Sequence, residues 1–437
     1  MNKKRSKTCS YLRFPPPSLA QGINGGSECV TFDINRIREF SRETKKLWYL
    51  AAPAVFTLVC QYSISGITQM FAGHVGTVQL AAISVQNSVI AGFAFGVMFG
   101  MGSALETLCG QAYGAKQLEM LGIYMQRSWI IVGTTALVLM FPYIFATPLL
   151  KLIGQDPEIS KWAGKFAVWM IPQLFANAIN FPIRKFLQAQ SKVVVMAAIA
   201  GVTVVGHTLF SWLLMLKMGW GLAGAALALN ASSWFMVVAN LAYIFSGTCG
   251  RAWSGFSCKA FQNLWGFVQL SFASAVMICL EMWYYMALIL FTGYLKNAEI
   301  AVDAIAICSN ICAWTFMVSF GLNVAVSIRV SNELGAGHPR TAKMSMIVAS
   351  FTSLLLGMFL ALVLLVFRSK FPPLFTNSKE VQTVVHELTP LLAVTVFINS
   401  LQPTLSGVAI GAGWQAYVAY VNIACYYLFG LPIGCWE

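Results

Sequence analysis

The stretch MIVASFTSLLLGMFLALVLLVF (346–367) decides the class of fold that this sequence can adopt. It contains no charged residue over a length sufficient for a helix to cross a lipid bilayer. Similar apolar runs recur along the 437 residues, of which only 10% are charged, whereas soluble proteins carry about 25% charged residues. Barrel strands would alternate over about ten residues, but these runs are continuous. The sequence therefore predicts an all-α polytopic membrane protein.

The predicted spans lie near residues 47–71, 79–103, 120–147, 159–182, 193–216, 221–246, 262–294, 298–326, 343–367, 383–411 and 414–435. When the segments between them are assigned alternately to the two sides of the membrane, 20 of the 28 Lys and Arg fall on the side of the N-terminus. The positive-inside rule therefore puts the N-terminus in the cytosol. This topology explains the net charge of +13, so we expect no nucleic-acid partner.

Two similar stretches predict that the chain is built from two related halves. FGVMFGMGSALETLCGQAYGA (95–115) and FMVSFGLNVAVSIRVSNELGA (316–336) match at seven positions. Six spans separate the stretches, so both copies have the same orientation, which indicates parallel repeats. We expect two pseudo-symmetric six-helix lobes, with substrate held between them.

The predicted domain boundaries follow from this repeat. A disordered cytosolic arm covers residues 1–45, because the prolines at 15–17 stand where the apolar core of a secretory signal would lie. The first six spans form an N-lobe over 46–246, and a cytosolic linker follows over 247–261. The C-lobe covers 262–437 and contains spans seven to eleven, so we expect its last helix to be absent.

The eleven cysteines predict neither a disulfide nor a metal site. No cysteine and histidine share the spacing of a metal-binding motif. The cysteines fall either in or beside predicted spans, or on the predicted cytosolic side, where thiols stay reduced.

Two carboxylates are predicted to lie within the membrane, where such groups are costly and usually functional. Glu281 lies about twelve residues from the outer end of its span, or ~18 Å deep. At that depth desolvation favours the neutral form, so this carboxyl can load and release a proton. The alternative is a neutral Glu that is hydrogen-bonded to a neighbouring helix. Asp303 lies nearer the outer surface, where either a coupling role or the helix dipole explains its presence.

Neutral polar residues in the spans are candidates for the substrate pathway. Asn310 follows Asp303 by seven residues and so lies on roughly the same helix face. The N-lobe offers Gln61 in its first span and the pair Gln86 and Asn87 in its second. The aromatic pair Trp283 and Tyr284 stacks either on a planar substrate or on neighbouring helices. Glu106 is expected to pair with a Lys or Arg, and His207 to be a hydrogen-bonded core residue.

The sequence closely resembles the plant multidrug and toxic compound extrusion transporters, the MATE or DETOXIFICATION family. The matching stretches are GMGSALETLCGQAYGAKQ (100–117), LEMWYYMALILFTGYLKNAEIAVDAIAIC (280–308), VSIRVSNELGAGHPRTAK (326–343) and SGVAIGAGWQAYVAYVN (406–422). The resemblance covers about residues 40–434 and implies a twelve-helix, two-lobed antiporter driven by a proton or sodium gradient. It implies no bound cofactor and no enzymatic reaction.

The resemblance also implies roles for individual residues. The membrane glutamate in the family's seventh helix falls on Glu281, and the eighth-helix asparagine falls on Asn310. Some relatives have an aspartate in the tenth helix where this chain has Asn399, which gives more weight to Glu281 and Asp303. The wording around 296–308 and 413–422 looks most like that of flavonoid and anthocyanin transporters. This likeness implies the vacuolar membrane first and the plasma membrane second.

Three functional hypotheses follow. The first is coupled antiport of small organic solutes, such as planar phenolics or xenobiotics, by a monomer in the lipid bilayer. The second is an anion-permeable channel of the same fold. The third is a shortened membrane protein that does not transport. No phosphate-binding loop motif is present, so direct use of ATP is not expected.

Overall fold

The structure, a computed structural model, describes residues 34–262, 264–292, 298–376, 378–430 and 432, without the side chains of 34–36, 285–303 and 374. Every regular element in these ranges is helical. The N-lobe contains α1 (Ile34–Val75), α2 (Thr77–Val85), η1 (Gln86–Ala91), α3 (Gly92–Gly114), α4 (Leu118–Ile144), α5 (Ala146–Leu152), α6 (Pro157–Trp169), α7 (Ile171–Ala189), α8 (Val193–Ser211), η2 (Trp212–Lys217), α9 (Gly221–Tyr243) and η3 (Ile244–Thr248).

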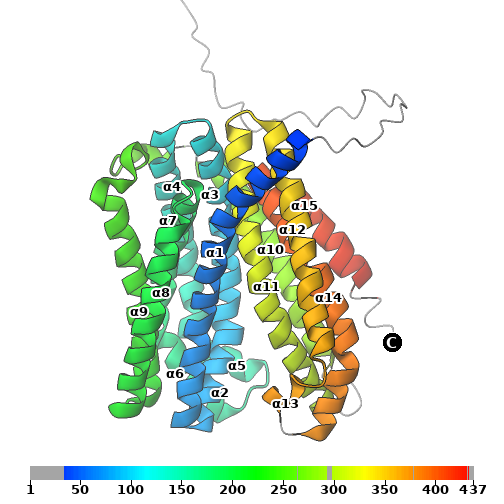
Figure 1. Cartoon of the computed structure of the whole chain (residues 1–437). Coiled ribbons are helices and arrows are strands. Elements are labelled where there is room, and N and C mark those ends of the chain that lie inside the picture. Colours follow the sequence, from blue (N-terminus) through cyan, green and yellow to red (C-terminus); the bar gives the residue numbers. More distant parts are fainter. Residues whose placement is uncertain (1–33, 263, 293–297, 377, 431, 433–437) are drawn as a thin grey trace, which may run out of the picture.

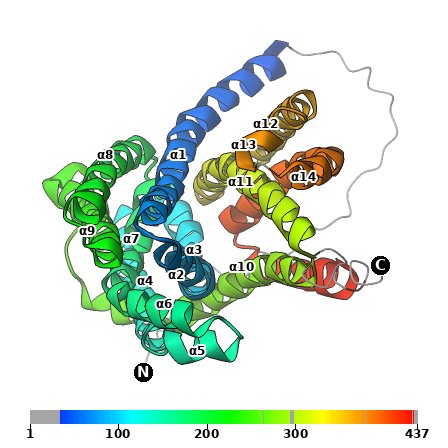
Figure 2. The same ribbon diagram turned by 90° about the horizontal axis from the view of Figure 1, so that it is seen from below.

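Two short turns connect the lobes, η4 (Gly250–Ala252) and η5 (Cys258–Phe261). The C-lobe contains α10 (Leu264–Thr292), α11 (Ala298–Gly335), α12 (Pro339–Val366), α13 (Pro372–Phe375), α14 (Lys379–Ala412), α15 (Gln415–Asn422) and η6 (Ile423–Gly430). Figure 1 shows these helices running side by side in one bundle, and Figure 2 shows the two groups from one end.

The predicted membrane helices are present in the structure. Among the described residues nine helices are long and apolar enough to span a bilayer, or ten if the pair α6 and α7 counts as one span. That pair is bent by 49°, and Pro172 stands at the start of α7, where its missing N–H costs nothing. The predicted span over 159–182 is therefore a broken helix that continues to Ala189. The predicted span over 414–435 corresponds to α15 and η6 as far as Gly430.

The first helix begins earlier in the chain than the predicted end of the disordered arm. We expected disorder up to residue 45, but α1 begins at Ile34. The reason is tertiary packing, since this part of α1 contacts α11 and α12 of the C-lobe. Figure 2 shows the start of α1 extending toward α12. Residues 1–33 lie outside the described residues.

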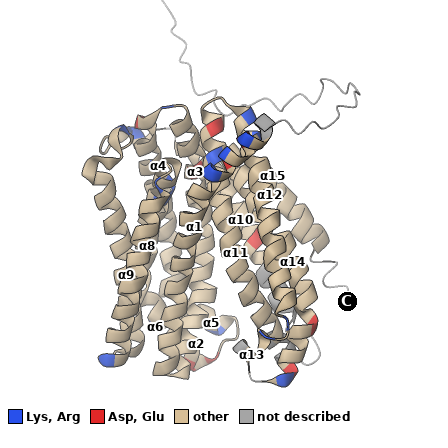
Figure 3. Cartoon of the chain, viewed as in Figure 1, with Lys and Arg blue, Asp and Glu red and all other residues tan. Residues whose placement is uncertain are grey.

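Most Lys, Arg, Asp and Glu positions lie toward the two ends of the bundle, and few lie in its middle, the part that faces lipid (Figure 3). The start of α1 lies at the upper end in Figure 1, whereas α5 and α13 lie at the lower end. Large apolar side chains such as Phe351, Phe359 and Leu362 of α12 are more than half exposed, which suits a lipid-facing surface.

The two repeated stretches pack against each other in the centre of the bundle. A side-chain carbon at Gly114 of α3 would overlap the backbone of Asn332 in α11, and one at Gly335 would overlap the backbone of Gln111. Gly114 aligns with Gly335 and Gln111 aligns with Asn332 in the repeat, so the two contacts are equivalent. Such reciprocal contacts define an isologous interface around a pseudo-twofold axis.

Candidate functional site

Glu281 lies on α10 and contacts one polar residue of a distant helix. The amide of Gln402, on α14, donates from Nε2 to Oε1 of Glu281 at 2.9 Å, and the same nitrogen donates to the hydroxyl of Ser406 at 3.3 Å. Glu281 is half-buried. No Lys, Arg or His of the described part forms an ion pair with it. The site is therefore a carboxyl group with a neutral hydrogen-bond donor and no counter-charge among the described residues.

The segments after α14 hold the backbone of α10 around Glu281. The side-chain amide of Asn422 donates to the carbonyl of Met277 at 3.1 Å, and the hydroxyl of Tyr427 donates to the carbonyl of Leu280 at 2.9 Å. The ring of Tyr284 stacks on that of Tyr426 with centroids 4.7 Å apart. Tyr284, proposed for the substrate pathway, therefore contacts a neighbouring helix.

Two of the predicted C-lobe pathway residues lie on helix faces that are directed toward the N-lobe. The exposed Trp283 ring stacks on Phe93 of α3, with centroids 6.5 Å apart and an interplanar angle of 6°. Asn310 of α11 is exposed and bonds its own helix at the carbonyl of Ala306. One turn further along α11, Trp314 packs edge-on against Tyr62 of α1 at 5.1 Å. This face of α11 is therefore directed toward the N-lobe.

Two further C-lobe candidates were predicted from the sequence, Asn399 and Asp303. Asn399 is half-buried and lies three residues before Gln402, on a neighbouring part of the same helix face. The backbone of Asp303 belongs to α11, but its side chain lies outside the described residues. Its coupling role therefore stays a prediction.

The N-lobe candidates have separate environments. The oxygen of the Gln61 amide accepts a hydrogen bond from Nη1 of Arg184, on α7, at 2.6 Å. Asn87 donates to the hydroxyl of Ser65 at 3.2 Å. Gln86 is 1% exposed, and both its amide atoms are buried without a hydrogen-bond partner. Gln86 and Asn87 begin the π-helical segment η1, a geometry that often occurs at functional sites.

Two buried polar groups of the N-lobe have the roles predicted for them. Glu106 accepts from Nζ of Lys185 at 2.5 Å, and the two side chains are 3% and 8% exposed. His207 is 1% exposed, with its ring nitrogens 2.9 Å from the hydroxyls of Thr68 and Ser232. Both groups therefore hold helices of the N-lobe together.

Sequence reasoning identified Glu281 but missed Gln402 and Arg184. No hydrogen bond between described residues joins Glu281 to Gln61 or Asn310. Gln402 is 121 residues from Glu281 along the chain, and no local pattern reveals such a pairing. Arg184 was assigned to a cytosolic loop, whereas α7 carries it within the bundle, where it lines a cavity.

The lobes are joined directly at the end that the charge distribution predicts to be cytosolic. Glu43 of α1 accepts from Nε of Arg329, on α11, at 2.7 Å and from the hydroxyl of Ser345, on α12, at 2.6 Å. The hydroxyl of Thr107, on α3, donates to the carbonyl of Ile410, on α14, at 2.5 Å. The two lobes are thus in direct contact at this end.

A bundle of two pseudo-equivalent lobes of membrane helices defines an integral multi-pass membrane protein with the architecture of secondary transporters. The profile of the MatE family matches residues 53–213 and 273–436, so the chain belongs to the MatE family. Members of this family are generally secondary active antiporters of small organic compounds and not enzymes.

The chain is similar to several proteins of Arabidopsis thaliana. It is 62% identical over 398 residues to Protein DETOXIFICATION 30, covering 91% of this chain and 80% of that protein. It is also 62% identical over 430 residues to Protein DETOXIFICATION 32, covering 98% of this chain and 81% of that protein. The solved structure of the eukaryotic MATE transporter AtDTX14 matches with a TM-score of 0.86 at 36% identity, covering 90% of this chain and 88% of that one.

Proposed function

We propose that this chain is an antiporter that exchanges protons for a small organic solute, with Glu281 as the proton-coupling group. The observation that carries the proposal is the lack of a counter-charge. Gln402 donates one neutral hydrogen bond to the carboxyl, and no cation of the described part pairs with it. An ionised carboxylate in such surroundings is costly, so it favours binding a proton or a cation.

The cycle requires that protonation and solute binding favour different arrangements of the lobes. Proton binding removes the charge of Glu281, which weakens the charge-assisted hydrogen bond from Gln402. That bond ties α10 to α14 within the C-lobe, so its loss frees both helices to shift against each other. A proton gradient then resets the carboxyl on the opposite side of the membrane.

We further propose a planar organic solute, and the vacuolar membrane before the plasma membrane as the location. The exposed Trp283 lies against Phe93 between the lobes, and a flat ring can insert beside such a pair. The chain is proposed to act as a monomer, with no cofactor beyond the gradient. Imaging of a fluorescently tagged chain in plant cells tests the location, and a phenolic panel in vesicles tests the solute.

Glu281→Gln is expected to abolish coupled flux while leaving membrane insertion intact, because glutamine has the same shape but cannot exchange a proton. The measurement is solute uptake into vesicles with an imposed pH gradient, with and without a protonophore. Glu387 lies in the first part of α14, away from Glu281 in the sequence. Glu387→Gln is therefore the matched control and should behave as wild type. Replacing the pH gradient by a sodium gradient tests the other coupling ion.

Two outcomes would contradict this proposal. Wild-type flux in the Glu281→Gln variant would remove this carboxyl from the mechanism. Wild-type uptake that ignores both the pH gradient and the protonophore would reject antiport and favour an anion-permeable pathway in the same fold.

A further inference from the structure

A small cavity lies at the edge of the N-lobe, where it meets α11, next to an arginine that has no anionic partner among the described residues. Its volume is about 20 Å³. The lining comes from α1, α7 and α8 of the N-lobe, with Val324 of α11 as the single contribution from the C-lobe. The polar lining residues are Thr57, Arg184 and Gln188, and the remainder is apolar.

The guanidinium of Arg184 is only partly satisfied. Its Nη1 donates to Gln61 at 2.6 Å, and the group lies 4.8 Å from the centre of the Phe181 ring. Its Nε is buried and has no hydrogen-bond partner. A guanidinium has five N–H donors, so these contacts leave most of its capacity unused.

No negative charge of the described residues compensates this cation. The carboxylates in ion pairs of the described part are Glu43, Glu106 and Glu333, and none of them pairs with Arg184. The neighbouring Lys185 is neutralised by Glu106. Charged groups buried in a membrane protein are normally paired, so the missing counter-charge points to a ligand.

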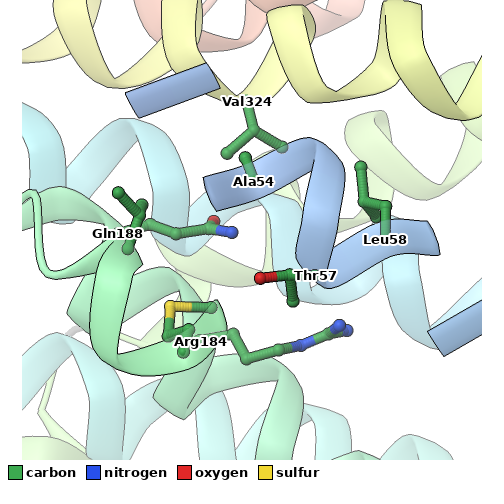
Figure 4. A pocket seen from close by; sticks show the side chains of 8 residues that line it. Ala54, Thr57, Leu58, Arg184, Gln188 and Val324 are labelled. Carbon is green, nitrogen blue, oxygen red and sulfur yellow. The ribbon is translucent and has the colours of Figure 1, made fainter. Parts of the chain in front are cut away.

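The other polar groups point into the same space. Figure 4 shows the amide of Gln188 and the hydroxyl of Thr57 directed toward one another, with the Arg184 side chain running alongside. The oxygen of the Gln188 amide is buried without a partner. A half-turn of that amide would replace the oxygen by its NH₂ group, which adds a second N–H donor to the lining of the cavity.

From this geometry we propose that Arg184 and Gln188 form a binding site for a small monovalent anionic group, with Gln61 positioning the guanidinium. The site takes either a free anion such as chloride or the carboxylate of an organic solute. One water needs roughly 10–15 Å³, so a cavity of about 20 Å³ admits one group of that size. The inference rests on the transport function proposed above and assigns the charge class of what is moved.

The test measures binding, and therefore needs no gradient. The purified full-length chain is heated in buffers of constant ionic strength, and its unfolding is followed by tryptophan fluorescence. Chloride and benzoate are the probes, and sodium HEPES supplies the remaining salt in every buffer. Wild type is expected to gain unfolding temperature in a saturable way with chloride, with benzoate or with both.

Arg184→Gln is expected to require about ten times more probe for the same effect, or to lose it, because the charge-assisted donors are gone. Arg340→Gln removes an exposed arginine from the start of α12 and should respond as wild type. Arg184→Lys keeps the charge but not the fork, so an intermediate weakening is expected even if Arg184→Gln does not fold.

The probes separate the two sources of the anionic group. A response to chloride alone indicates a free anion, whereas benzoate that competes with chloride indicates the carboxylate of a solute. Equal responses in wild type, Arg184→Gln and Arg184→Lys would overturn the proposal, and so would a wild type that responds to neither probe. Glu281→Gln should bind the probes normally, so failure of coupled flux and failure of anion binding are distinguishable.

Discussion

At the scale of single residues, the polar groups within the membrane divide into structural and functional sets by their partners. Lys185 and Glu106 neutralise each other at 2.5 Å, and His207 is enclosed by hydroxyl groups. Glu281 and Arg184 have only neutral hydrogen-bond partners in the described part. These two groups, without a counter-charge among the described residues, lie on α10 of the C-lobe and α7 of the N-lobe.

Gln402 is predicted to be a positioning residue for Glu281. Gln402→Leu removes the only described donor to that carboxyl and should slow coupled flux about tenfold, the effect of losing one charge-assisted hydrogen bond. Uptake into vesicles at several proton gradients measures the change. Ser406→Ala removes only the second, longer contact of the Gln402 amide and should have a clearly smaller effect. A Gln402→Leu variant with wild-type dependence on the gradient would contradict this role.

Sequence alone could find Glu281, because an acidic residue deep in an apolar run is conspicuous. It could not find Gln402 or the role of Arg184. Their significance depends on contacts between helices far apart in sequence, and on where a helix ends relative to the bundle. The same limit applies to Tyr284, whose stacking on Tyr426 depends on how η6 packs against α10.

At the scale of the helices, hydropathy predicted the existence of the spans better than their shape. Pro172 marks a point where the run over 159–182 can kink, but hydropathy gives neither the break between α6 and α7 nor its angle of 49°. Likewise, residues 34–45 are polar in sequence yet helical, because the start of α1 packs on the C-lobe. Tertiary contacts decide both features.

The crossing of α3 and α11 depends on glycine for space, and not for backbone freedom. Gly114→Ala and Gly335→Ala each place a carbon against the backbone of the other helix, so each should destabilise the protein by about 1–3 kcal/mol. Thermal unfolding of the purified variants measures this. Gly133→Ala, in α4, is the matched control, because nothing lies within 4 Å of the added carbon. Equal unfolding temperatures for all three variants would show that the helices do not cross closely.

At the scale of the whole molecule, the repeat in the sequence predicted two lobes in parallel orientation, and the fold agrees with MATE transporters of known structure. Seven matching positions were enough to reveal the repeat. In the structure the two matched stretches occupy equivalent places beside the pseudo-twofold axis. The connection between the lobes through Glu43 and Arg329 was not predictable, since these residues are 286 positions apart in the chain.

The ion pair that joins the lobes is predicted to contribute strongly to stability. Glu43 is 5% exposed, so Arg329→Gln leaves a buried carboxylate without its cation, which costs about 3–5 kcal/mol. Lys46 also pairs with Glu43, but the Lys46 side chain is 49% exposed. Lys46→Gln should therefore cost no more than about 1 kcal/mol. Unfolding temperatures of both variants give the comparison. A larger loss from Lys46→Gln would refute the buried pair as the main connection.

The reciprocal crossing at Gly114 and Gly335 restricts how the two halves can diverge. A larger residue at either glycine meets main-chain atoms of the opposite helix. A substitution in that helix changes side chains and cannot remove main-chain atoms. No compensating substitution in the twin copy can therefore restore the fit. At this crossing both related halves therefore require glycine, although most other positions of the two repeated stretches differ.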